Sequence, residues 1–513
     1  MTEVAGAAAR GGHVGGDQRE RVPRRAWGAL AAVLLACFLH QFDLTVISVA
    51  VPSLQADLAA SPSSVQWLVA GYTLTFAVLL VPAGRLGDAV GRRVLVIAGV
   101  VGFTLASLAC ALAPNEGVLV AARVAQGGSA ALLAPQVMPV VMLMFPAARR
   151  GAAMGAFAAS VALATTSGPL LGGLLVGADL FGLGWRAIFV VNVPVGAAAL
   201  VLALACLPRA ENTGRAADPA LNGWRRARID VFSVALALVG LLLLIAPLVQ
   251  GRELGWPWWA IVLPVASVPV LAALVPAQRR TLRAGGLPLI APELFQQRAY
   301  LAGAAVNFLV VGGVTAFFLV FVVYLQVPLG RSPAATGLTV APWALASAVA
   351  SAAAIPLAGR FGRRMLETGA VLMVAGMVLL LGFVVAQGTA LDTAAVVVSL
   401  VIVGVGMGML SPPLYSITLM SMSRQDIGSA SGVFSAVGQA GGAFGVATGG
   451  TIFYGVVAGG GPDVAPGGWT AAIGWALVHQ VVVYVVAVVV LRRCLPAAGS
   501  SGPPRAPEPG RSP

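Results

Sequence analysis

The stretch Leu133–Gly173, LAPQVMPVVMLMFPAARRGAAMGAFAASVALATTSGPLLGG, decides the fold because it occurs twice in the chain. It aligns without a gap with Leu410–Gly450, LSPPLYSITLMSMSRQDIGSASGVFSAVGQAGGAFGVATGG, at a separation of 277 residues, so that Gly173 meets Gly450. A second echo pairs AGRLGDAVGRR with the shorter AGRFGRR. Parallel repeats with a site at their interface are a transporter architecture. The repeat therefore predicts a chain of two related halves.

The composition indicates that the halves lie in a lipid bilayer. Of 513 residues, 59% are hydrophobic and only 10% are charged, which no water-soluble globular domain usually shows. A transmembrane helix needs about 20 consecutive apolar residues, and the sequence predicts fourteen such spans. They cover residues 26–50, 64–84, 94–113, 117–141, 152–178, 187–207, 229–250, 257–277, 300–325, 335–358, 365–386, 391–415, 427–457 and 469–491.

The repeat divides these spans into two bundles and an insertion. We expect an all-α integral membrane protein in which residues 26–207 and 300–492 each form a six-helix bundle. Residues 208–299 supply a linker with two additional helices, while residues 1–25 form a cytoplasmic tail and 493–513 a disordered tail.

Arginine is distributed unevenly along the chain. The protein has 31 basic residues, all of them arginine, and 27 of these fall on one side of the membrane if both termini are cytoplasmic. This pattern follows the positive-inside rule, so the high net charge indicates orientation and no nucleic-acid partner. The absence of lysine excludes a P-loop, which requires one after its glycines, and with it ATP hydrolysis by that route.

The residues that carry enzyme chemistry are sparse. The four cysteines are far apart without a CxxC pair, and the three histidines form no metal-binding motif. We therefore expect no cofactor, no metal and no enzymatic activity.

One acidic residue lies near the middle of the first span, in LLACFLHQFDLTVISVAVP (Leu34–Pro52). An ionised Asp43 at a helix centre costs about 2.5 to 3.5 kcal/mol on insertion scales. Either it pairs with Arg123 of the fourth span and only joins two helices, or it takes up and releases a proton during transport. His40, one turn away, is either a satisfied polar residue or a proton relay.

Two glycine-rich motifs flank these charges. In GRLGDAVGRRVLV (Gly84–Val96) the glycines permit a tight turn, and helical spacing allows an ion pair between Asp88 and Arg92. Alternatively, Asp88 reaches the amides at the start of the thirteenth span, Ile427–Ser431, and holds one side shut. Gly84 and Gly91 complete this gating motif.

The fifth span contains GPLLGG, in which Pro169 lacks the amide that would bond to Thr165. Gly168 and Gly172 form a seam for close helix packing, and Gly173 follows it. Kink and seam together predict a helix that bends and slides.

With these motifs in this order, the sequence resembles the major facilitator superfamily over nearly its whole length. FDLTVISVAVP, WRAIFVVNVPVG and the fourteen spans suggest its branch of drug:proton antiporters. The resemblance implies proton-driven export, with Asp43 and Arg123 serving coupling and Gly168–Gly173 marking antiport. The second half departs from the pattern, since it lacks the acid of the loop motif and has Leu400 where Arg123 would recur.

Aromatic side chains offer candidate contacts for a flat cationic or neutral substrate, although such stripes are also common in helix packing. The candidate pocket residues are Tyr72 and Phe76 in the second span and Phe317, Phe321 and Tyr324 in the ninth.

The sequence thus predicts a proton-coupled exporter of amphiphilic toxic compounds in the cytoplasmic membrane. Its expected partners are a small-molecule substrate, protons and lipid, and we expect it to work as a monomer. The alternatives are a dedicated exporter of one natural product or metabolite, and a transport-inactive membrane sensor.

Overall fold

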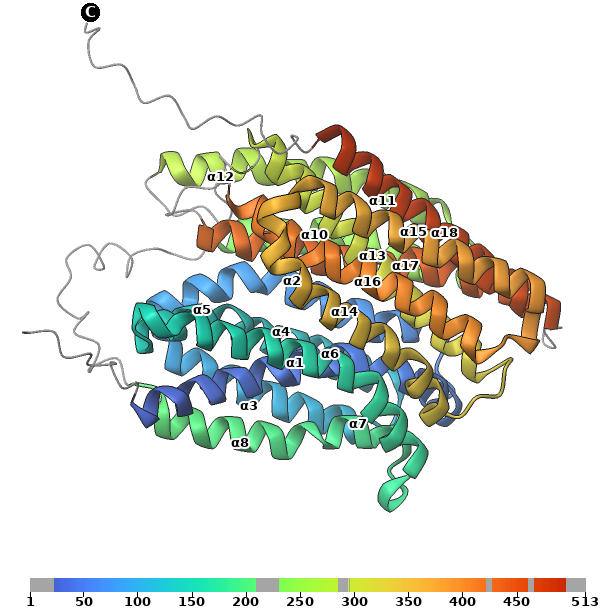
Figure 1. The fold of residues 1–513 in the computed structure, drawn as a ribbon, viewed down its shortest axis with the longest axis horizontal. Coiled ribbons are helices and arrows are strands. Elements are labelled where there is room, and N and C mark those ends of the chain that lie inside the picture. The colour runs from blue at the N-terminus through green and yellow to red at the C-terminus, as the bar shows by residue number, and fades with distance from the viewer. Residues whose placement is uncertain are drawn as a thin grey trace, which may run out of the picture.

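The structure is a computed structural model that describes residues 23–208, 230–284, 294, 296–420, 427–459 and 466–494. Within these ranges it contains fourteen helical spans long and apolar enough to cross a membrane, which confirms the predicted fold class. Figure 1 shows the helices lying side by side, with the blue-to-green first half below the yellow-to-red second half. The helices are α1 (Arg24–Leu58), α2 (Pro62–Val90), α3 (Arg92–Ala111), α4 (Glu116–Leu133), α5 (Val137–Met144), α6 (Ala147–Ala178), α7 (Ala187–Val190), α8 (Asn192–Cys206), α10 (Val231–Gln250), α11 (Trp258–Ala272), α12 (Leu274–Arg283), α13 (Arg298–Gln326), α14 (Pro333–Phe361), α15 (Arg363–Gln387), α16 (Thr393–Met420), α17 (Ile427–Gly459) and α18 (Pro466–Cys494).

The helices are longer than some predicted spans, because helical hydrogen bonding continues into the polar residues that follow an apolar run. The first helix runs over Arg24–Leu58 and continues through Pro52, although hydropathy predicts only residues 26–50. Three spans consist of two helical pieces each, namely α4 with α5, α7 with α8, and α11 with α12. Backbone amides exposed to lipid must bond within the chain, so helix is the favoured conformation throughout.

The two halves repeat the same helix contacts. Helix α1 packs on α6 as α13 packs on α17, and α2 packs on α4 as α14 packs on α16. Glycines at corresponding positions permit these close approaches. A side chain at Gly127 would collide with the Tyr72 carbonyl, and one at Gly404 with the Trp343 carbonyl. The repeat in the sequence is therefore a repeat of backbone contacts.

The halves meet along two seams, between α2 and α17 and between α6 and α14. We call the end of the bundle where α1 begins the terminal end, and the other the opposite end. At the opposite end a side chain at Gly173 would collide with the Pro333 carbonyl, and one at Gly450 would lie 2.7 Å from Gln66. The two glycines that correspond in the repeat thus occupy corresponding places in the two seams.

The inserted helix α10 contacts both halves, since it packs against α2 and α17. Beyond its end, Glu253 accepts hydrogen bonds from the Ser63 amide at 2.9 Å and the Ser63 hydroxyl at 2.6 Å, at the start of α2. On the other side, the Thr451 hydroxyl of α17 donates to the Leu248 carbonyl at 2.7 Å. The insertion therefore joins the halves at the opposite end.

We predict that Gly173→Leu separates α6 from α14 at the opposite end, because the new side chain cannot fit against the Pro333 carbonyl. A cysteine pair replacing Gly177 and Ala334 measures this, since their β-carbons would lie 3.5 Å apart, within disulfide range. With the native cysteines replaced, the disulfide yield should fall by more than half.

The matched control is Gly155→Leu, because Gly155 lies in the same helix with open space around it. It should leave the disulfide yield unchanged. An unchanged yield for Gly173→Leu as well would contradict the role of this glycine in the seam.

Candidate functional site

The centre of the first half contains a fully buried ion pair. Asp43 of α1 and Arg123 of α4 are both 0% exposed, and one guanidinium nitrogen donates to the carboxylate. The same nitrogen donates to Gln126 at 2.7 Å, and Arg123 Nε donates to the Leu68 carbonyl at 3.1 Å. The arginine is thereby fixed to α1, α2 and its own helix.

The second carboxylate oxygen of Asp43 has two amide donors. Gln126 Nε2 lies 2.9 Å from it and Asn192 Nδ2 of α8 lies 3.1 Å from it. Both amides also donate to the hydroxyl of Ser107 in α3, at 2.7 and 3.2 Å. All five side chains are buried, so four helices meet at one polar network.

Such a network is stable only while its charges stay paired. Removing a buried ion from water costs several kcal/mol, and the attraction of the partner offsets this only when further hydrogen bonds complete the site. Among the described residues, Asp43 is the one buried acid and Arg123 the one buried arginine. Protonation of Asp43 would remove the attraction and leave Arg123 with its bonds to Gln126 and Leu68.

The network extends to His40 through an aromatic ring. The Arg123 guanidinium lies 4.3 Å from the centre of the Tyr72 ring, a cation–π contact. The Tyr72 hydroxyl and His40 Nδ1 are 2.6 Å apart, and the His40 ring stacks on Phe76 at 4.3 Å. Tyr72 therefore links His40 to the ion pair.

Three network members, Gln126, Asn192 and Ser107, are not among the residues that the sequence singles out. Two of them had a signal. Gln126 lies three residues after Arg123, on the same helix face, and Asn192 is the one amide residue of WRAIFVVNVPVG. Ser107 had none, because a serine in an apolar helix usually bonds to its own backbone.

The GPLLGG segment connects α1 to the seam between the halves. A side chain at Gly168 would collide with Thr45, and one at Gly172 would lie 2.6 Å from Val46, both in α1. Gly173 faces α14, and a side chain at Gly337 of α14 would collide with the Pro169 carbonyl. One helix turn thus contacts both the helix that carries Asp43 and the other half of the protein.

The gating motif forms the turn between α2 and α3. Gly91 has φ of +102°, a conformation that favours glycine, and joins the two helices. A side chain at Gly84 would lie 3.6 Å from Pro135, and Arg92 donates to the Pro139 carbonyl at 3.4 Å. The side chain of Asp88 lies outside the described part of the structure, so its expected partners stay predictions.

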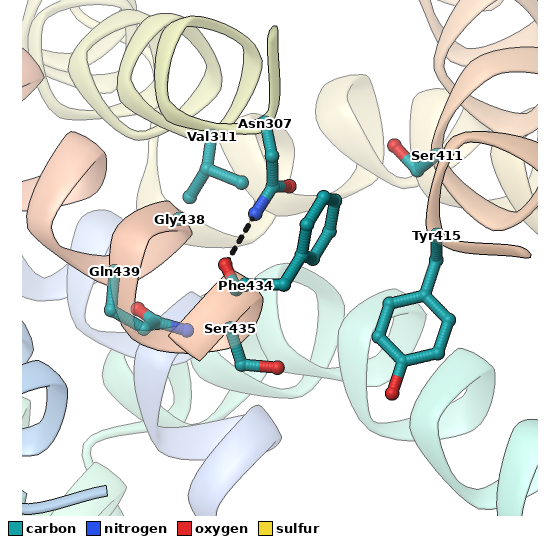
Figure 2. A pocket seen from close by; sticks show the side chains of 8 residues that line it. All are labelled: Asn307, Val311, Ser411, Tyr415, Phe434, Ser435, Gly438 and Gln439. Carbon is teal, nitrogen blue, oxygen red and sulfur yellow. Dashed lines mark hydrogen bonds between the residues drawn. The ribbon is translucent and has the colours of Figure 1, made fainter. Parts of the chain in front are cut away.

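A cavity of about 250 Å³ lies in the second half, among α13, α16 and α17. Tyr415 and Phe434 form an edge-to-face pair 5.5 Å apart at its wall. Figure 2 shows these rings and the side chains that line the space, and the Asn307 amide donating to the Phe434 carbonyl at 2.9 Å. The lining residues are Asn307, Val311, Ser411, Tyr415, Phe434, Ser435, Gly438 and Gln439.

The five aromatic residues expected to contact substrate lie in two separate places, and none of them lines this cavity. Tyr72 and Phe76 belong to the surroundings of the ion pair. Phe317 and Phe321 stack at 4.8 Å within α13, and the Tyr324 hydroxyl donates to the Gly388 carbonyl at 2.9 Å. Their contact with substrate stays a prediction.

A repeated helical membrane fold with a buried ion pair and a cavity between helices is typical of a membrane transporter. The sequence pattern of the Major Facilitator Superfamily matches residues 33–446. The chain therefore belongs to this superfamily. Its transporters move small molecules, commonly with protons, as monomers, and they are not enzymes.

The chain is similar to exporters of antibiotics and drugs. It is 42% identical to "Probable actinorhodin transporter" of Streptomyces coelicolor over 84% of this chain and 73% of that protein. It is 32% identical to "Multidrug resistance protein Stp" of Mycobacterium tuberculosis over 82% of this chain and 75% of that protein. Together with the fourteen spans of this chain, these relatives confirm the predicted branch of drug-efflux transporters.

Among solved structures, the fold is similar to a bacterial homolog of the human lysosomal transporter Spinster in an inward-facing and occupied conformation. The TM-score is 0.62 at 17% identity, covering 92% of this chain and 96% of that chain. This likeness supports the fold.

We predict that Arg123→Leu destabilises the protein strongly, because it leaves the Asp43 carboxylate buried without its cation. Loss of one partner of a buried pair typically costs about 3 to 5 kcal/mol. The melting temperature of the purified protein should fall by several degrees, and Asp43→Asn in addition should restore much of the loss. A double-mutant cycle measures the coupling.

The exposed pair of Arg186 with Asp57 is the matched control, since its side chains are 30% and 47% exposed. Exposed pairs contribute about 1 kcal/mol or less. Equal melting temperatures for Arg123→Leu and Arg186→Leu would show that the buried pair contributes no more to stability than the exposed pair, and would contradict the prediction.

Proposed function

We propose that this protein exports amphiphilic small molecules in exchange for protons by alternating access. The observation that supports this most directly is the Asp43 carboxylate, which is fully buried and bonded to Arg123, Gln126 and Asn192. A proton delivered to this carboxylate would cancel its attraction to Arg123. The site can therefore couple proton uptake to a change in helix contacts.

The packing of α6 provides a route for this change to reach the second half. Helix α1 carries Asp43 and contacts α6 at Gly168 and Gly172, while α6 contacts α14 at Gly173. When protonated Asp43 loosens α1 from α4, α6 shifts on the glycine seam and the halves rock. In this proposal, Pro169 supplies the bend, and Asp88 of the gating motif closes the other end against the start of α17.

In the present structure the two halves are in contact at the opposite end, and the cavity lies nearer the terminal end. At the opposite end, Gln326 of α13 donates to the Val49 carbonyl of α1 at 2.9 Å, across the halves. The cavity residue Asn307 lies in the first half of α13, which begins at the terminal end. With cytoplasmic termini, this arrangement corresponds to a transporter that receives substrate from the cytoplasm.

The substrate range has two candidate forms. The name of the relative from Streptomyces coelicolor concerns a single compound, and that of the relative from Mycobacterium tuberculosis concerns many drugs. Efflux of actinorhodin and of ethidium, compared in one strain, separates a dedicated exporter from a broad one. A protein that moves neither, nor any other compound of an antibiotic panel, would instead fit the transport-inactive sensor.

We predict that Asp43→Asn abolishes proton-driven transport while the protein still inserts, because the amide keeps the shape and cannot titrate. Substrate-dependent proton movement in inverted vesicles should fall at least tenfold, to the level of vesicles without the protein. The control is Asp57→Asn, which removes an exposed acid of the same helix and should retain most of the wild-type rate. Wild-type transport by Asp43→Asn at several pH values would remove Asp43 from the mechanism.

We also predict that both termini and the linker 208–228 face the cytoplasm, because 27 of 31 arginines then lie inside. Single cysteines at Thr213 and Asn115, in a background without native cysteines, test the orientation. An impermeant thiol reagent added to intact cells should label Asn115→Cys and spare Thr213→Cys. The reverse pattern would invert the topology.

A further inference from the structure

The cavity in the second half has a composition that selects ligands by charge. Its eight lining residues include no acid and no base, whereas they include two amides, three hydroxyl groups and two aromatic rings. We infer that this cavity binds an uncharged ring system bearing hydroxyl or carbonyl groups, and that Gln439 and Ser435 determine this selectivity. The inference rests on the proposed function, because it treats the cavity as part of the transport path.

The aromatic wall provides the apolar part of the site. Phe434 and Tyr415 are perpendicular, at 83°, with their ring centres 5.5 Å apart. A flat ring can pack on one of them and meet the edge of the other, the geometry that aromatic groups favour. Tyr415 remains 42% exposed in the structure, so its ring is accessible to a ligand.

The polar part of the site is fixed by a glycine. A side chain at Gly438 would lie 2.5 Å from the Asn307 amide, so only glycine lets this amide cross to the Phe434 carbonyl. Because its nitrogen is engaged there, Asn307 presents its carbonyl oxygen as an acceptor (Figure 2). Gln439 and Ser435, one turn apart on α17, add donor and acceptor groups at the same wall.

Among the described residues, a cation in this cavity would find no carboxylate to pair with. Transfer of an ammonium group into an apolar site without a partner is costly, and the one buried acid of the described chain is Asp43. That carboxylate is committed to Arg123 and to the amides of Gln126 and Asn192. The cavity therefore offers hydrogen bonds and ring contacts to a neutral ligand, and neither it nor the ion pair offers a free negative charge.

The volume of the cavity limits the size of the ligand that it can bind. Sites for drug-sized ligands usually measure about 300 to 1,000 Å³, and this cavity measures about 250 Å³. It accommodates a bicyclic compound or one ring portion of a larger one. Size-matched bicyclic probes are thus suitable for the test, namely 1-naphthol, which is neutral at pH 7, and N-methylquinolinium, which is permanently charged.

The experiment measures equilibrium binding of both probes to the full chain in lipid nanodiscs at pH 7, with binding to empty nanodiscs subtracted. We expect wild-type protein to bind 1-naphthol at least tenfold more tightly than N-methylquinolinium. Loss of one neutral hydrogen bond corresponds to about a three- to tenfold loss of affinity. Gln439→Leu and Ser435→Ala should each weaken 1-naphthol binding by that factor.

Ser399→Ala is the matched control, because the Ser399 hydroxyl bonds to the Ala395 carbonyl within α16 and does not line the cavity. It should leave both affinities unchanged. Gln439→Glu introduces a carboxylate and should shift the preference toward N-methylquinolinium at least tenfold.

Tighter wild-type binding of the cation would overturn the inference, as would affinities that no cavity variant changes. Because binding requires no proton gradient, these outcomes are independent of proton coupling. If Asp43→Asn still stops transport while the cavity variants bind normally, the proposed function holds and the cavity inference fails. If the cavity variants behave as expected and Asp43→Asn transports normally, the cavity inference holds and the proposed proton coupling fails.

Discussion

A single buried ion pair constrains the first half of this protein. The bilayer cannot solvate a charge, so Asp43 and Arg123 must find their partners inside the bundle. Those partners come from α2, α4 and α8, and Ser107 of α3 bonds to two of them, which fixes the position of four helices around α1. In the proposed mechanism, a proton that neutralises Asp43 removes the reason for that arrangement.

Glycines allow the close helix contacts that connect α1 to the rest of the fold. Lipid provides no hydrophobic driving force between helices, so close backbone contact holds them together. In α6, three glycines within six residues face two different neighbours, α1 and α14. The same segment therefore packs against α1, which contains Asp43, and against α14 of the other half. The inserted α10 adds a third connection at the opposite end, through Glu253 and Thr451.

The two halves have the same helix packing and different chemistry. At the positions that correspond to Arg123 and Gln126, the second half has Leu400 and Val403, both buried among apolar side chains. The second half contains instead the uncharged cavity beside α17. In the proposed mechanism, the proton therefore acts in the first half and the substrate binds in the second half.

The sequence by itself determined the fold class and the number of spans, and it gave the pairing of Asp43 with Arg123 as one of two alternatives. These follow from apolar run length, an internal repeat and the cost of a lone charge in lipid, which are all local or periodic properties. Tertiary structure alone decided that Ser107 and Asn192 complete the ion-pair site. It also decided that Tyr72 lies over Arg123, outside the cavity that Gln439 lines. The physical reason is that helical periodicity specifies a face, whereas the neighbour that a face meets depends on how distant helices pack.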